Sequence, residues 1–315
     1  MRMLSTFVLV ILGIAMLAPN ILSRVVRQRI DTGFNTKVSR PAYVKTHPKV
    51  LFDEAHNNSD TSSGRYNPFS DLITSDGYAV VPGLKPFSNG VLQGYSVLVI
   101  VNASGPEGRR NSSPFTEQEC NAVRDWVRAG GALLLICDQA PFSTAAAGLG
   151  ERFVIALTKG FTIDPVHHNK ESEDDTELVF SRENTLLKDH PITRGRSPQE
   201  RINRIITFTG TSLTGPAGSA AFLGLGDTAI DVFPSDIKPS APGEAAPDPK
   251  KVSAAGRAQG IALIFGKGRV VVLGEAAMLT AQVALRGFPF GMNVPGIDNR
   301  QLALNVMHWL SGLLK

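Results

Sequence analysis

Two continuous apolar runs with a capped helix between them constrain the fold more than any other feature of the sequence. Residues 95–101 read YSVLVIV and residues 132–137 read ALLLIC, and such runs are typical of strands buried on both faces of a parallel sheet. Between them, Thr116 to Glu119 match a capping box, an apolar stripe follows, and Gly130 and Gly131 end the helix. This order predicts right-handed crossovers and an α/β fold with a doubly wound sheet.

Further segments extend the same sheet. Residues 50–52 and 78–81 are short apolar runs that predict two more strands. Residues 260–265 and 269–273 flank a Gly-Lys-Gly turn and predict a late β-hairpin. Residues 299–314 have an apolar stripe at helical spacing. We therefore expect a mostly parallel sheet with a late β-hairpin and a C-terminal helix that docks on it.

The N-terminus differs in composition from the rest of the chain. Residues 3–22 are almost entirely apolar, long enough for a bilayer span and also suited to the core of a signal peptide. We expect residues 1–23 to be a signal peptide or membrane anchor and residues 24–48 to be a basic, polar tether. Residues 49–315 are then one α/β domain, in which residues 234–256, rich in Pro, Ala, Ser and Lys, form a flexible excursion.

The charge distribution argues against nucleic acid as a partner. The chain has a net charge of +4, but residues 1–49 hold eight Lys and Arg and one Asp, which leaves the body at about −3. A footprint for nucleic acid needs its basic residues on the folded body.

By the positive-inside rule, Arg24, Arg27 and Arg29 after the apolar run favour a cytoplasmic body.

Polar side chains follow the predicted strands and mark a candidate site. The carboxyl ends of parallel strands meet at one edge, so we expect these residues to converge on one crevice. Carboxylates and an imidazole suit acid–base chemistry, whereas the structural alternative is helix caps and turns. The catalytic candidates are Glu54, His56, Asp138 and Glu275, and the ligand-binding candidates are Asp53, Asn57, Asn58, Asn102 and Gln139.

No cofactor is predicted, and a divalent metal ion is left open. Asp53, Glu54 and His56 are too close in sequence to hold a metal by themselves and would need Asp138 or Glu275 from another strand. The glycine-rich phosphate cradle and the Gly-x-Ser-x-Gly elbow are absent from the sequence. The two cysteines at positions 120 and 137 are expected to be buried thiols without a disulfide between them.

Several segments of the sequence, taken together, resemble those of a known superfamily. They are VLFDEAHNN at residues 50–58, FTEQECNAVRDWVRAGGALLLICDQAPF at 115–142, DHPITRG at 189–195, GRVVVLGEAAMLTAQ at 268–282, and the closing residues 298–313. The chain from residue 49 to residue 315 resembles the class I glutamine amidotransferase-like superfamily. More narrowly, it is similar to an uncharacterised bacterial branch related to the GIFT domain of intraflagellar-transport proteins and to gliding-motility auxiliary proteins.

The resemblance implies a flavodoxin-like fold and, because members of the branch are usually exported, a location outside the cytoplasm. It also implies a comparison with the catalytic residues of true amidotransferases, which place a nucleophilic Cys in a Gly-x-Cys-x-Gly elbow and a His two residues before a Glu. Here the matching strand end reads Ile136-Cys137-Asp138-Gln139, and no His lies near Glu275. Glutamine hydrolysis is therefore not expected.

Three functions follow from this sequence. The leading hypothesis is an exported or membrane-tethered domain that binds a small ligand, a glycan or a protein partner at the crevice without glutaminase activity. The alternative is an envelope hydrolase, metal-assisted or using Glu54, His56, Asp138 and Glu275 in acid–base catalysis. A scaffold in a membrane complex is a third interpretation. The expected location is periplasmic or otherwise extracytoplasmic, with a cytoplasmic-facing anchor as the alternative.

Overall fold

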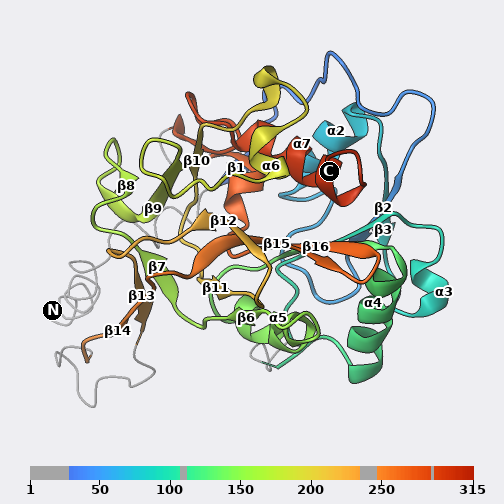
Figure 1. Cartoon of the computed structure of the whole chain (residues 1–315), viewed down its shortest axis with the longest axis horizontal. Helices are drawn as coiled ribbons and strands as arrows, with labels where there is room; N and C mark the ends of the chain where they lie inside the picture. The colour runs from blue at the N-terminus through green and yellow to red at the C-terminus, as the bar shows by residue number, and fades with distance from the viewer. Residues whose placement is uncertain (1–27, 107–111, 235–246, 285–286) are drawn as a thin grey trace, which may run out of the picture.

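The apolar runs of the sequence form adjacent strands in the middle of a nine-stranded sheet (Figure 1). The computed structural model describes residues 28–106, 112–234, 247–284 and 287–315. The strands follow one another across the sheet as β3 (Ala79–Gly83), β2 (Lys49–Asp53), β4 (Val97–Val101), β5 (Ala132–Ile136), β16 (Gly268–Leu273), β15 (Ala258–Phe265), β11 (Leu213–Thr214) and β6 (Ala156–Leu157), and β12 (Ala220–Gly224) also pairs with β15.

The sheet is parallel on one side and antiparallel on the other. Strands β3, β2, β4, β5 and β16 all run in the same direction. Strand β15 turns back to form the predicted hairpin with β16, and β11, β12 and β6 continue in antiparallel pairing. The predicted flavodoxin-like α/β fold with its late hairpin is confirmed. The antiparallel strands extend the central sheet beyond the hairpin.

Helices cover both faces of the sheet (Figure 1). The side chains of β4 alternate: Val97, Val99 and Val101 pack in one apolar cluster, and Leu98 and Ile100 pack in the other. The first cluster includes α2 (Asn67–Ser75) and the predicted C-terminal helix α7 (Asn299–Leu310), and the second includes α4 (Glu117–Ala129) and α5 (Phe142–Glu151). The shorter helices are α3 (Asn89–Leu92), α6 (Pro191–Arg194), η1 (Pro198–Glu200) and η2 (Ala277–Leu279).

Three small antiparallel sheets lie beside the central one. One of them includes β14, which belongs to the predicted excursion at 234–256; residues 235–246 of that excursion lie outside the described part. The sheets are β1 (Arg29–Ile30) with β17 (Ala281–Val283) and β18 (Pro289–Gly291), β10 (Arg204–Ile206) with β9 (Asp174–Ser181) and β8 (His168–Asn169), and β14 (Lys250–Ser253) with β13 (Ile230–Phe233) and β7 (Phe161–Ile163).

The segment expected to be a tether contacts the body from residue 28 onward. Strand β1 pairs with β17, and the backbone N–H of Ala42 donates to Asp76 Oδ1 at 2.8 Å. Asp76 Oδ2 in turn lies 2.6 Å from Nε2 of His308 in α7, and both side chains are 1% exposed. Asp76 therefore joins the N-terminal segment, the end of α2 and the C-terminal helix.

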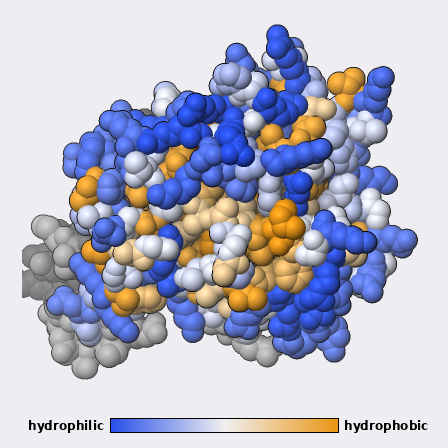
Figure 2. Space-filling model, in the orientation of Figure 1, coloured by the Kyte–Doolittle hydropathy of each residue, from blue (hydrophilic) through white to orange (hydrophobic). Residues whose placement is uncertain are grey.

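Residues 1–27, which hold the predicted signal peptide or anchor, lie outside the described residues. Within the ranges that are described, none of the helices has the length and the apolar character that a membrane span requires. Figure 2 shows a mostly hydrophilic face with hydrophobic residues gathered over β12, β15 and β16. Other exposed large apolar side chains lie on separate elements, such as Val44, Leu84 and Phe288.

Replacing Asp76 should destabilise the whole fold. In Asp76→Ala, His308 and the N–H of Ala42 lose a buried hydrogen-bond partner, and each buried polar group left unpaired costs about 1–3 kcal/mol. We expect this loss in the free energy of unfolding measured by urea denaturation. The matched control is Asp71→Ala, an exposed residue of the same helix, which should stay within about 0.5 kcal/mol of the parent. Equal effects of the two substitutions would contradict the assignment.

Candidate functional site

Four of the nine predicted site residues meet in one cavity at the carboxyl ends of the parallel strands. Asn102 follows β4, Asp138 and Gln139 follow β5, and Glu275 follows β16. The parallel register places these strand ends side by side, with Val101 opposite Ile136 and Ile136 opposite Leu273. The predicted convergence is thus observed for the turns after the three central strands.

The cavity has a volume of about 420 Å³ and a mixed lining. Carboxylates, amides, hydroxyls and phenyl rings all contribute to it, together with one arginine among the described residues. Besides the four residues above, the polar and aromatic lining consists of Gln28, Ser59, Asp60, Arg65, Phe142, Asp174, Thr176, Glu177, Phe208, Thr209, Thr280, Gln282 and Phe290. Such a combination of apolar surface with several converging polar groups is typical of a small-molecule site.

Asn102 organises the polar floor of this cavity. Its Nδ2 donates to Asp60 Oδ2 and to Asp138 Oδ2, each at 2.8 Å, and its Oδ1 accepts the backbone N–H of Asp138 at 3.0 Å. Asn102 has a φ of 43°, a left-handed conformation that Asn tolerates better than most residues. Arg65 lies 3.2 Å from the other oxygen of Asp60. The amide thereby holds two carboxylates from different turns in fixed positions.

Asp60 and Arg65 are site residues that the sequence analysis missed. The predicted polar run after β2 ends at Asn58, although Ser59, Asp60 and the residues up to Ser63 continue it. The length of that polar run was the signal that points to them. Asp60 is 1% exposed, so it is a buried carboxylate whose partners are Asn102 and Arg65.

Asp138 and Glu275 are carboxyl groups that tend to hold a proton. Asp138 Oδ1 accepts the N–H of Ala276 at 2.8 Å, and Glu275 accepts the N–H groups of Ala277 and Met278 at 2.6 and 2.7 Å. Burial raises the pKa of Asp138 to about 6 against the opposing hydrogen bonds. Burial, with the nearby charge of Asp138, raises the pKa of Glu275 well above its usual range. Both groups therefore favour the protonated form more than an exposed carboxyl group does.

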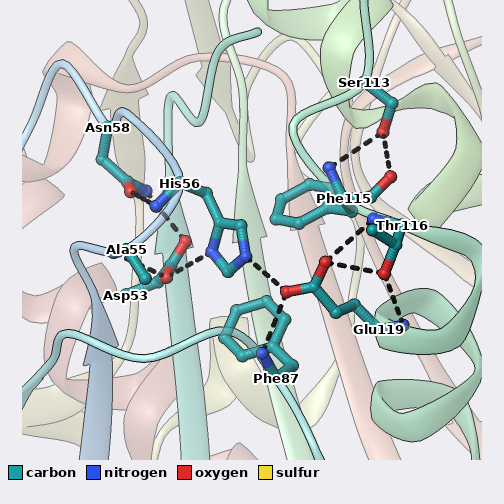
Figure 3. A network of polar contacts seen from close by, with 9 residues as sticks. All are labelled: Asp53, Ala55, His56, Asn58, Phe87, Ser113, Phe115, Thr116 and Glu119. Atoms are coloured by element: carbon teal, nitrogen blue, oxygen red, sulfur yellow. Dashed lines mark hydrogen bonds and ion pairs between the residues drawn. The ribbon is translucent and has the colours of Figure 1, made fainter. Parts of the chain in front are cut away.

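His56 lies in a separate, closed network (Figure 3). Its Nδ1 is 2.7 Å from Asp53 Oδ1 and its Nε2 is 2.8 Å from Glu119 Oε1. The rings of Phe87 and Phe115 cover it at centroid distances of 4.5 and 4.8 Å. Burial by itself would lower the pKa of His56, but Asp53 and Glu119 outweigh it and hold that pKa above its usual value.

The remaining polar residues after β2 are also engaged in local bonds. Glu54 Oε1 accepts the N–H and the hydroxyl of Ser62 at 2.9 and 2.6 Å. Asn57 donates to Ser104 Oγ and to the carbonyl of Gly105, each at 3.0 Å. Asn58 donates to Asp53 Oδ2 at 3.1 Å.

The structure corrects the prediction of one shared crevice. None of Asp53, Glu54, His56, Asn57 and Asn58 lines the cavity. The physical reason lies in Glu119, which was predicted only as part of the capping box of α4. That box is present, but the second oxygen of Glu119 also binds His56 and so draws the imidazole toward α4 instead of toward Asp138.

The two cysteines are free and buried. Burial, together with the nearby Asp138, raises the pKa of Cys137 far above that of a reactive thiol. Burial raises the pKa of Cys120 to about 11. Across the described ranges, no group of three or more His, Cys, Asp and Glu side chains is arranged to hold a metal ion. The divalent metal left open by the sequence therefore has no identified site in this part of the chain.

Comparisons with known proteins agree with the fold. No protein-family model and no curated protein matches the chain. The solved mmIFT52 N-terminal domain matches with a TM-score of 0.59 at 15% identity, covering 84% of this chain and 97% of that one. ThuA-like proteins from Bacteroides uniformis and Parabacteroides merdae match at 12% identity with TM-scores of 0.40 and 0.43, covering 86% of this chain in each case and 95% and 91% of theirs.

At these identities a likeness shows the fold alone. Together with the parallel strand order and the helices on both faces, it supports a flavodoxin-like α/β fold for the chain. The site must be interpreted from its own residues, because related folds host many unrelated functions.

Removing His56 should destabilise the fold. In His56→Ala, the buried carboxylates of Asp53 and Glu119 lose the cation between them and two phenyl rings lose their contact, at a cost of about 3–5 kcal/mol. The free energy of unfolding in urea measures this loss. His47→Ala, at an exposed position, is the control and should change it by less than about 0.5 kcal/mol. A loss below about 1 kcal/mol in His56→Ala would be inconsistent with this network.

Asp138 should make stability depend on pH. Its pKa is raised from 3.8 to about 6 in the fold, so its contribution is fully present below about pH 4 and is lost as pH rises through about 6. Between pH 4 and 7.5 the parent should lose about 1–3 kcal/mol relative to Asp138→Asn. Urea denaturation at each pH gives this difference. The exposed Asp227→Asn control should follow the parent, and parallel curves for Asp138→Asn and the parent would refute the effect.

Proposed function

We propose that residues 49–315 form a binding domain for a small polyhydroxylated ligand, a glycan unit, held in the cavity at the carboxyl ends of the parallel strands. The observation that carries this proposal is the lining of a cavity of about 420 Å³, which combines carboxylates, amides and phenyl rings. Vicinal hydroxyls bind well to side chains that accept and donate hydrogen bonds in a plane, and the apolar face of a sugar ring packs on an aromatic ring.

The polar floor supports this proposal because it is already ordered. Both Nδ2 hydrogens and Oδ1 of Asn102 are used inside the protein, so the carboxylates of Asp60 and Asp138 hold their positions without a ligand. A site whose groups are fixed in advance loses less entropy on binding. The rings of Phe208 and Phe290, 4.2 Å apart between centroids, provide the aromatic part of the wall.

Glutaminase activity does not form part of the proposal. A glutamine amidotransferase needs a thiolate nucleophile at an exposed turn, whereas Cys137 is 1% exposed and burial disfavours its thiolate by raising its pKa. The two glycines that would make the turn tight are also missing around it. Ligand binding without chemistry at Cys137 fits these observations better.

The subcellular location of the domain is also part of what we propose. We place the domain outside the cytoplasm, exported or tethered to the inner membrane by residues 1–23, with the membrane as a partner. Support comes from the apolar N-terminus and from the resemblance to the exported branch related to GIFT and gliding-motility auxiliary domains. The solved mmIFT52 N-terminal domain has a similar fold. The arginines after the apolar run favour the alternative, a body facing the cytoplasm.

A second candidate is an envelope hydrolase that uses Asp138 and Glu275. The observation in its favour is the pKa of Asp138, raised to about 6 by burial beside other carboxyl groups, which suits a general acid near neutral pH. Of the four residues first suggested for this chemistry, these two line the cavity, and Glu54 and His56 do not. The hydrolase proposal is therefore narrowed to a carboxyl pair.

Sugar binding should depend on Phe290 and not on its neighbour Phe288. The full chain is titrated with mono- and disaccharides by calorimetry, and a ligand that binds also raises the thermal midpoint. Phe290→Ala should weaken binding about tenfold because the ring lines the cavity. Phe288→Ala removes a ring that is 64% exposed and lies outside the cavity lining, and it should bind like the parent. An equal loss in both variants, or no binding of any sugar, would refute the proposal.

The hydrolase candidate is tested in the same samples. Chromatography of the saccharides after incubation should show no cleavage if the domain only binds them. Cleavage that Asp138→Asn abolishes, while binding persists, would favour the hydrolase instead.

A further inference from the structure

We infer that the glycan held in this cavity carries an acetamido group, as N-acetylated amino sugars do, and that Gln282 accepts the N–H of that group. This inference rests on the proposed function and names its ligand more closely. It is carried by a buried carbonyl oxygen that lines the cavity without a hydrogen-bond partner and by the aromatic ring beside it.

Gln282 has a carbonyl oxygen that the protein leaves unpaired. Its side chain lines the cavity and is 1% exposed, and its Oε1 has no hydrogen-bond partner among the described residues. Thr280 settles the orientation of the amide, because the Thr280 hydroxyl donates to the carbonyl of Ala277 at 2.8 Å and therefore accepts from Gln282 Nε2 at 2.7 Å. The unpaired atom is thus an acceptor, which a donor on a ligand can satisfy.

An aromatic surface lies beside this acceptor. Gln282 and Phe290 are cross-strand partners in the antiparallel pair of β17 and β18, and both line the cavity. The Cβ atoms of such partners lie about 4.5–5.5 Å apart on the same face of a sheet. The ring of Phe290 in turn contacts that of Phe208, with 4.2 Å between centroids. A ligand group that binds here must therefore combine a donor with an apolar part close to it.

The carboxyl groups of the cavity wall do not call for a charged donor. Asp60 is paired with Arg65 at 3.2 Å. Burial raises the pKa of Asp138 to about 6 and that of Glu275 well above its usual range, so both favour the neutral form. The other two accept hydrogen bonds inside the protein, Asp174 from Thr176 and Glu177 from Asn169. A neutral donor therefore suits this wall.

An acetamido group matches the surroundings of Gln282. Its N–H only donates, whereas a hydroxyl also brings an acceptor that would need a partner of its own. Its methyl group loses contact with water when it packs on the Phe290 ring. Arg65 offers a donor for its carbonyl oxygen, because this side chain lines the cavity, is 46% exposed and has five N–H donors.

Gln139 explains why the acetamido group belongs to a sugar. This residue follows β5 and lines the same cavity, and its Oε1 is also buried without a partner in the described ranges. A second donor is therefore needed, and it comes from a different part of the ligand because an acetamido group has only one. The hydroxyl groups of a sugar ring supply it.

The decisive comparison is among probes that differ only in one group of the sugar. The full 315-residue chain is titrated by calorimetry with methyl N-acetylglucosaminide, its ester analogue methyl 2-O-acetylglucoside, and methyl glucoside. The ester keeps the methyl and carbonyl groups and lacks the N–H. The acetamido sugar should bind about tenfold tighter than the ester, because only it can donate to the buried oxygen of Gln282.

A variant assigns the preference to Gln282. Gln282→Met keeps the approximate volume of the side chain and removes its carbonyl oxygen, so it should weaken binding of the acetamido sugar about tenfold and leave binding of the ester within about twofold. Gln118→Met, at an exposed position on α4, is the matched control and should bind like the parent. The thermal midpoint of each variant without ligand shows whether it is folded.

The outcomes separate this inference from the proposed function. Equal binding of the three glucosides would overturn the acetamido inference and leave the glycan proposal standing. N-acetylglycine N-methylamide, an amide without a sugar, is the fourth probe. If it binds and the glucosides do not, the glycan proposal is overturned. Binding of none of the four would overturn both proposals. A folded Gln282→Met variant that still prefers the acetamido sugar tenfold would overturn the role of Gln282.

Discussion

The amide of Asn102 is the interaction on which the cavity depends. It stands between two turns that are far apart in sequence, and it bonds Asp60 from one and Asp138 from the other. An Asn side chain has two amide hydrogens and one carbonyl oxygen, and all three are used here. A fully satisfied network of this kind is rigid. Asp60, from the loop after β2, and the turns after β4 and β5 therefore form one floor. The N–H of Ala276, next to Glu275, donates to Asp138 and joins the turn after β16 to this floor.

The fold was predictable because its signals are local. The buried strands, the capping box of α4 and the late hairpin each follow from a few adjacent residues, and the structure shows all of them. The parallel order then predicted that Asn102, Asp138, Gln139 and Glu275 would meet. That part of the site needed only the rule that parallel strands end at the same edge of the sheet.

The rest of the site depends on contacts that no local pattern encodes. His56 turns toward Glu119, 63 residues away, because the helix cap uses only one oxygen of that carboxylate and the other binds the imidazole. The outer wall of the cavity comes from small antiparallel sheets whose strands have only two to eight residues. Their pairing is set by long-range register, so Gln282 and Phe290 carry no sequence signal that marks them as site residues.

The network around His56 and the network that lines the cavity differ in how completely their polar groups are paired. This difference distinguishes the residues that stabilise the fold from those available to bind a ligand. In the closed network Glu119 Oε1 bonds His56 and the N–H of Phe87, and its Oε2 bonds the N–H and hydroxyl of Thr116. In the cavity the carbonyl oxygens of Gln139 and Gln282 have no partner among the described residues. The residue types that most resemble a catalytic group, a His between two carboxylates, thus stabilise the fold. The unpaired groups in the cavity are the ones with which a ligand can form hydrogen bonds.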